Sequence, residues 1–154
     1  MPPADEPFSV SRFQMLEADH RVMELLLAGH QEALLGFELS SALAKLEEFA
    51  RRLRQHIRAE EELLAAAESL KLDWPRGGTP EILRQEHGKI EEKLTELLGA
   101  MRGVSRGSGR KVVLAILERG VRFKSLLEHH VQREEEIVLP ALKALASGAR
   151  PRPA

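Results

Sequence analysis

Apolar side chains recur three and four residues apart over four long stretches of this 154-residue chain. That spacing is the helical period, and a helix with an apolar stripe must bury the stripe against other helices. No strand-like alternation interrupts the pattern. We predict helices over residues 11–35, 40–70, 79–102 and 110–139. Pro140 is expected to kink or restart the last helix, because proline lacks the backbone N–H that a helix interior uses.

Breaks rich in glycine, proline and serine separate the helical stretches. Residues 71–78 contain a Trp-Pro and a Gly-Gly pair, and residues 103–109 contain three glycines and two serines. Both compositions are typical of loops. Ser40 and Thr79 stand where they can cap the helices that follow them, and a proline after Thr79 suits a first helical turn.

Four helices with short connections predict an all-α fold, an up-down-up-down antiparallel four-helix bundle. We expect a single domain, since 154 residues suit one hydrophobic core. The bundle is predicted over residues 11–146. Residues 1–10 are expected to form a flexible N-terminus and residues 147–154 a flexible C-terminal tail.

Composition excludes several classes of function. The 23 basic and 24 acidic residues nearly cancel, so nucleic acid and anionic membranes are not expected as partners. Without cysteine there are no disulfides, thiolate zinc sites, cysteine-bound iron–sulfur clusters or thiol nucleophiles. No secretory signal and no apolar run of about 18 residues is evident, so we expect a cytoplasmic protein.

Two helices repeat one motif of metal-ligand type. His56 and His130 are each followed, after three residues, by three glutamates that begin at Glu60 and Glu134. Residues four apart lie one turn apart on the same helical face. Each His–Glu pair can therefore reach one metal ion, or one each of two adjacent ions.

The other two helices supply further candidates at the same depth. His87 and Glu91 share the four-residue spacing, and the first helix offers His20. Counting about 1.5 Å per residue from one end of the bundle places all four histidines roughly 22–30 Å down. A single layer of histidines is what a metal centre requires.

The candidate ligands also extend the buried stripes. His56 follows Phe49 and Leu53 at helical spacing, and His130 follows Phe123 and Leu127 in the same way. A buried histidine and glutamate without partners would cost several kcal/mol, which bound cations remove. Imidazole and carboxylate together suit iron, manganese or zinc.

The order of one histidine and three His-x-x-x-Glu motifs resembles the hemerythrin-like, HHE cation-binding domain, over about residues 11–146. The resemblance implies two irons bridged by two carboxylates and by an oxo or hydroxo group. Glu60 and Glu134 would bridge. The histidines would divide in pairs, His20 with His56 and His87 with His130. The implied metal ligands are His20, His56, Glu60, His87, Glu91, His130 and Glu134.

At one position the chain departs from the oxygen-carrying members that it resembles. They have a histidine where this chain has Glu91. The resemblance then implies a site richer in carboxylate and less suited to reversible oxygen carriage. If Glu91 does not bind, its iron has an open position for water, peroxide or NO. Zinc and manganese stay open as alternative metals.

Several neighbouring residues are given lesser roles. His130 is favoured over His129 as ligand because its segment copies that of the second helix, and His129 is considered for the outer shell. His30 lies about 80° around the helix from His20 and is expected at the surface or the helix end. Other glutamates are expected to be solvated or to support the ligands: Glu61, Glu62, Glu135 and Glu136.

These observations predict a non-haem di-iron protein that binds or reacts with O₂, NO or peroxide in sensing, detoxification or iron handling. Whether it is an enzyme is left open. One alternative is an iron donor or iron–sulfur repair accessory, although such proteins usually carry a cysteine-bearing N-terminal region that this chain lacks. Another is a metal-free or zinc-bound interaction module. Nothing in the sequence names a protein partner.

Overall fold

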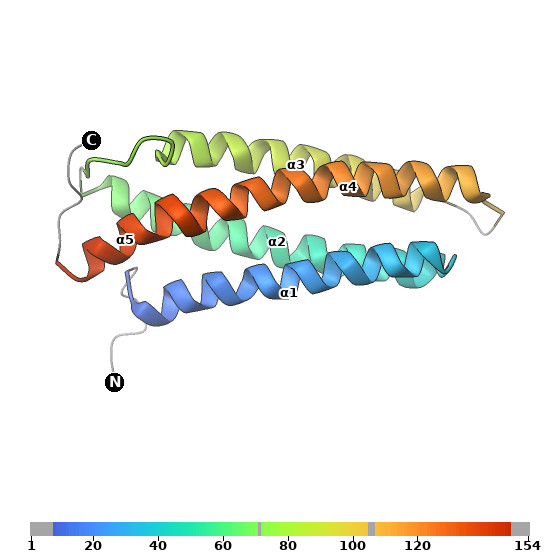
Figure 1. The fold of residues 1–154 in the computed structure, drawn as a ribbon, viewed down its shortest axis with the longest axis horizontal. Coiled ribbons are helices and arrows are strands. Elements are labelled where there is room, and N and C mark those ends of the chain that lie inside the picture. The colour runs from blue at the N-terminus through green and yellow to red at the C-terminus, as the bar shows by residue number, and fades with distance from the viewer. Residues whose placement is uncertain (1–7, 71, 105–106, 149–154) are drawn as a thin grey trace.

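Four long helices run antiparallel and side by side (Figure 1). They are α1 (Val10–Leu35), α2 (Leu39–Glu68), α3 (Pro80–Arg102) and α4 (Arg110–Arg133). The computed structural model describes residues 8–70, 72–104 and 107–148, and no strand occurs among them. The predicted all-α four-helix bundle is therefore confirmed. Most of the predicted flexible ends, residues 1–7 and 149–154, lie outside the described residues.

Side-chain caps begin two of the helices. Ser9 Oγ accepts a hydrogen bond from the Arg12 N–H at 3.3 Å, and Thr79 Oγ1 accepts one from the Ile82 N–H at 3.4 Å. These bonds satisfy amide groups that have no partner within the first helical turn. The cap predicted at Thr79 is confirmed.

The turn between α1 and α2 differs from the prediction that Ser40 caps the second helix. α2 begins at Leu39, one residue before Ser40. The chain reverses through Phe37, whose φ of 55° is in the left-handed region. The N–H groups of Phe37 and Glu38 bond back to the carbonyls of Leu34 and Ala33, which closes the end of α1. Backbone bonds therefore set this boundary.

The last helix changes its geometry before Pro140. α4 ends at Arg133, a π-helical turn η1 follows (Glu134–Val138), and α5 (Leu139–Ala146) resumes the α-helix. Proline removes one donor from the ladder, and the wider π turn absorbs the break. The expected restart at Pro140 thus begins earlier, at Glu134, and leaves Pro140 in the first turn of α5.

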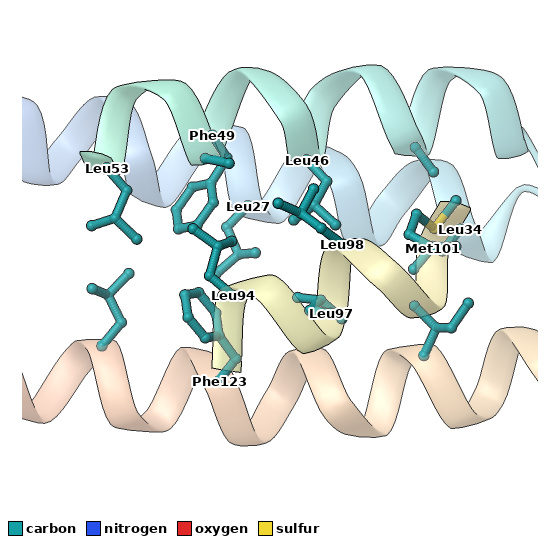
Figure 2. Close-up of a cluster of buried hydrophobic side chains, with 14 of the residues drawn as sticks. Leu27, Leu34, Leu46, Phe49, Leu53, Leu94, Leu97, Leu98, Met101 and Phe123 are labelled. Carbon is teal, nitrogen blue, oxygen red and sulfur yellow. The ribbon is translucent and has the colours of Figure 1, made fainter. Parts of the chain in front are cut away.

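Two apolar clusters fill the bundle. The larger cluster lies toward the α1–α2 turn, where Phe49 and Phe123 meet edge to face with ring centroids 5.7 Å apart (Figure 2). The smaller cluster lies near α5 and includes Phe13, Leu64 and Leu142. Trp74, in the connection between α2 and α3, packs against this smaller cluster.

A layer of polar side chains separates the two clusters. On α1, His20 lies between Leu16 of the smaller cluster and Met23 of the larger one. On α3, His87 lies in the same way between Leu83 and Ile90. The fold therefore places histidines at a depth where water is excluded on both sides. Among the described residues, no helix combines the length and apolarity needed to cross a membrane.

Candidate metal centre

Six of the seven predicted ligands meet in this layer. Each is buried, with 3–8 % of its surface exposed: His20, His56, Glu60, His87, His130 and Glu134. Each of the four long helices supplies a histidine. Because Glu134 opens the π turn directly after α4, its side chain also projects inward.

The six side chains form two overlapping groups of four. One group is His20 and His56 with the two glutamates, and the other is His87 and His130 with the same two glutamates. Within each group, one ligand atom from every residue lies within 4.8 Å of the others. Both groups thus share the carboxylates of Glu60 and Glu134, so two cations bound there would be adjacent.

The donor atoms converge closely. His20 Nε2 lies 3.0 Å from Glu134 Oε2 and 3.1 Å from His56 Nε2. On the other side, His87 Nε2 lies 2.8 Å from Glu60 Oε2. A set of nitrogen and carboxylate oxygen atoms facing one point suits a transition-metal ion.

Three buried atoms of this layer test whether a metal fits. Glu60 Oε1, His130 Nε2 and Glu134 Oε1 have no hydrogen-bond partner among the described residues. His130 Nε2 and Glu134 Oε1 are only 2.6 Å apart, yet the contact does not have hydrogen-bond geometry. Buried polar atoms without partners destabilise the fold. A cation bound at the point that these donors face would remove that free-energy penalty. The residues therefore fit a metal pair.

A carboxylate contacts the outer nitrogen, Nδ1, of each of the four histidine rings in this layer. Nδ1 of His20 lies 2.9 Å from Glu135, and Nδ1 of His87 lies 2.5 Å from Glu61. Asp19 and Glu86 hold the other two rings at 3.1 and 3.2 Å. In the neutral ring that binds a metal, Nδ1–H donates to the carboxylate and Nε2 offers its lone pair, so the contact also sets the ring orientation.

These carboxylates link the helices in a closed cycle. Each one is the sequence neighbour of a candidate ligand and contacts a histidine of the adjacent helix. Asp19 on α1 contacts His56 on α2, and Glu61 on α2 contacts His87 on α3. The cycle continues from α3 to α4 and closes from η1 back to α1. The orientation of each ring therefore depends on the neighbouring helix.

The shared carboxylates dominate the electrostatics. Burial alone would lower the pKa of the buried histidines, but Glu134 and Glu60 outweigh it and raise the pKa of His56 to about 11 and that of His130 to about 10. Burial would raise the pKa of Glu60, yet its contacts with Glu134, His130 and His56 hold it well below its usual value. The two buried carboxylates give this layer a negative charge that protons or metal ions must balance.

A family model agrees with this geometry. The hemerythrin HHE cation-binding domain model matches residues 1–67 and 79–154, which is nearly the whole chain. The chain belongs to this family. No curated protein and no solved structure matches it. The resemblance seen in the sequence is confirmed, and the described residues of this HHE domain bring together His and Glu groups able to hold metal ions.

Glu91 is the predicted ligand that the structure does not bring to the centre. Its carboxylate accepts hydrogen bonds from Arg54 on α2, with Arg54 Nη2 donating to Oε1 at 2.7 Å. The side chain is 45 % exposed. In this HHE domain the four-residue spacing from His87 places Glu91 beside α2, where a guanidinium is the nearer partner.

The two remaining histidines have structural roles. The prediction that His30 lies at the surface or the helix end is wrong, since His30 is fully buried and its Nδ1–H donates to the Ala42 carbonyl at 2.7 Å. Burial lowers the pKa of His30, so the ring is neutral. His129 is exposed and bonds the Ser125 carbonyl, while its neighbour His130 faces the centre, as the motif comparison favoured.

Sequence reasoning left two supporting residues without a role. Asp19 and Glu86 immediately precede His20 and His87, but each contacts a histidine of another helix. The adjacency was visible in the sequence. The cross-helix partner was not, because it depends on the rotation of neighbouring helices about their axes.

Two cavities adjoin the centre. A groove of about 720 Å³ runs between α1 and α4, and its lining includes His20 and Glu135. A small cavity of about 20 Å³ lies against Glu60 and Glu134, and its other lining residues are apolar. A volume of this size accommodates about one water-sized molecule. The His20 side of the centre thus borders a groove open to solvent, and the two glutamates border a small apolar space.

Proposed function

We propose that this HHE domain is a non-haem di-iron protein that binds or reacts with a small ligand such as O₂, NO or peroxide. Sensing, detoxification and iron handling are the roles that this chemistry serves. One observation carries the proposal. Two groups of four buried donors share Glu60 and Glu134, which is the arrangement that two bridged cations need. A cytoplasmic location belongs to the same proposal.

The donor set supports iron together with an exchangeable ligand. Each metal would receive two imidazole nitrogens and two carboxylate oxygens. Four donors fill a tetrahedral zinc site, but iron commonly takes more ligands, so positions remain for a small molecule. Bound iron would supply Lewis acidity and redox chemistry at those positions.

The side chains of the domain would prepare the centre for such a ligand. The Nδ1 contacts hold each ring in place and leave Nε2 free to bind. The apolar clusters on both sides keep bulk water out and lower the local dielectric. The groove that His20 lines brings a small molecule to the edge of the centre, and the cavity beside Glu60 and Glu134 has room for about one water-sized molecule.

Metal analysis tests the proposal directly. The protein is expressed in iron-replete medium, and metal per chain is measured by plasma mass spectrometry together with an ultraviolet–visible spectrum. We expect about two irons per chain, since the two donor groups define two sites, with ferric charge-transfer bands in the near ultraviolet. Titration with NO or azide should perturb those bands.

Zinc is the second candidate, because the same four-donor groups satisfy tetrahedral zinc. A protein that takes up zinc in place of iron under these conditions, or no metal at all, contradicts the di-iron proposal and favours a helical interaction module. Two results together favour an iron donor: the protein keeps its fold when a chelator removes its iron, and the loaded protein transfers iron to an acceptor protein. The iron-loaded protein with ligand-responsive bands favours the proposed function.

A further inference from the structure

Arg54 makes three hydrogen bonds to the carboxylate of Glu91. Nε donates to Oε1 at 3.0 Å and to Oε2 at 3.2 Å, and Nη2 donates to Oε1 at 2.7 Å. The guanidinium thus grips both oxygens of the carboxylate, an arrangement with fixed geometry. Thr95 Oγ1 adds a longer contact of 3.4 Å to the same Oε1 atom.

Glu91 has the spacing of a ligand but not the position of one. It follows His87 by four residues, as Glu60 follows His56 and Glu134 follows His130. Both residues of the other two pairs belong to the donor groups. Of His87 and Glu91, only His87 does, and the Glu91 carboxylate lies against Arg54 on α2.

The ion pair has little value for stability alone. Both side chains are substantially exposed, 40 % for Arg54 and 45 % for Glu91. Exposed pairs of this kind contribute roughly 0–1 kcal/mol. The ion pair matters more for the metal centre, which lies one helical turn away. There, a Glu91 carboxylate free of Arg54 would compete for the metal next to His87.

We propose that Arg54 is a positioning residue that withholds Glu91 from the metal centre and so keeps a coordination position open on the His87–His130 side. The inference rests on the proposed di-iron function. With Arg54 present, four protein donors serve that side. Without it, Glu91 is a fifth candidate donor, tethered to the same helix as His87.

Azide titration of the iron-loaded protein tests the proposal. The variants are Arg54→Met, Glu91→Gln and the double variant, and Arg51→Met is the matched control. Arg51 lies on the same helix and pairs with Glu48, away from the six donors. Iron per chain, the spectrum without azide and the melting temperature are measured for each protein.

In Arg54→Met we expect the iron content of the parent, a changed spectrum without azide, and an azide Kd raised about tenfold or more, because a carboxylate tethered next to His87 then competes with azide for the open position. The double variant should regain the parent Kd, because the Glu91→Gln change leaves no anionic oxygen at this position. Glu91→Gln alone and Arg51→Met should match the parent.

Three results overturn the inference even when the parent protein loads two irons. The first is an iron-loaded Arg54→Met protein that binds azide as the parent does. The second is an iron-loaded parent that binds no azide, since no position is then open. The third is loss of iron in Glu91→Gln, because Glu91 would then be a ligand in the parent. An iron-free parent contradicts the proposed function, and this inference with it.

Discussion

Glu61 Oε1 lies 2.5 Å from Nδ1 of His87, although the two residues belong to different helices. Glu61 thus orients the His87 ring, and the other nitrogen of that ring, Nε2, faces Glu60. Consecutive residues of α2 thus hold the two nitrogens of one imidazole. Because three equivalent contacts close the cycle around the bundle, the metal site and the packing of the helices depend on each other.

Glu61→Gln should weaken metal binding without removing a ligand. The amide is a poorer acceptor for Nδ1–H, so His87 loses orientation and basicity. We expect metal affinity to fall about 10- to 100-fold, with the number of ions at saturation unchanged. Competition with a chelator measures the change. Glu62→Gln is the control, since Glu62 is 70 % exposed and pairs with Arg12. Equal effects of the two substitutions would contradict the assigned contact.

Removing a shared carboxylate should cost more metal than removing a histidine. Glu60→Ala takes a donor from both groups, whereas His20→Ala takes one from a single group. We expect Glu60→Ala to lose both ions and His20→Ala to retain one. Both should melt lower than the loaded parent, because metal binding energy is partly folding energy. Full metal content with parental melting in Glu60→Ala would show that the donor assignment is wrong.

Metal loading should release protons. The pKa of His56 is raised to about 11 and that of His130 to about 10, so both rings are protonated at pH 7 in the metal-free protein. A metal must displace those protons, and the pKa values of His20 and His87 are raised as well, so at least about two protons per chain should be released. Calorimetry in two buffers of different ionisation enthalpy measures the number. Metal affinity that does not rise between pH 6 and pH 8 would refute the assignment.

The same shifts set the pH dependence of the metal-free fold. Both histidines have folded pKa values above their ordinary value of 6.5. Their stabilisation is therefore fully present below pH 6.5 and is lost as the pH rises through about 10 to 11. Melting of the chelated protein should fall over this window. The metal-loaded protein should lack this decline, because its rings are already deprotonated.

Phe37→Gly should be more stable than Phe37→Ala. Phe37 adopts a φ of 55° at the end of α1, a conformation that costs a side chain about 1 kcal/mol and costs glycine almost nothing. Phe37 is 48 % exposed, so both substitutions lose the same partial burial of the ring, and only glycine also removes the strain. We expect a higher midpoint of denaturant unfolding for Phe37→Gly than for Phe37→Ala. Equal midpoints would contradict strain at this position.

Gly78→Ala should disturb the π turn beside the centre. A Cβ at this position would lie 2.7 Å from Cγ2 of Ile137, within η1, and 3.3 Å from Pro75 Cγ. We expect a loss of about 1–3 kcal/mol, typical of overpacking, together with weaker metal binding through Glu134. Gly99→Ala is the control. Its Cβ would meet no atom of the described chain within 4 Å beyond its own helix, so it should be neutral or stabilising. Equal losses in both would argue against this packing.

The sequence by itself determined the helices and the faces that they bury. Helical period is a local property, so apolar spacing placed Leu53 and His56 on one stripe, and the repeated four-residue motif added Glu60. The same logic identified His130 over His129, and the structure places the former inside and the latter at the surface.

Only the tertiary structure decided what faces each side chain across a helix boundary. Glu91 has the local spacing of a ligand, yet the neighbouring helix presents Arg54 to it. Asp19 likewise contacts His56 of the next helix and not its sequence neighbour His20. Such pairings depend on the rotation and register of packed helices, which many weak contacts over the whole core set together. A spacing pattern along one helix does not contain that information.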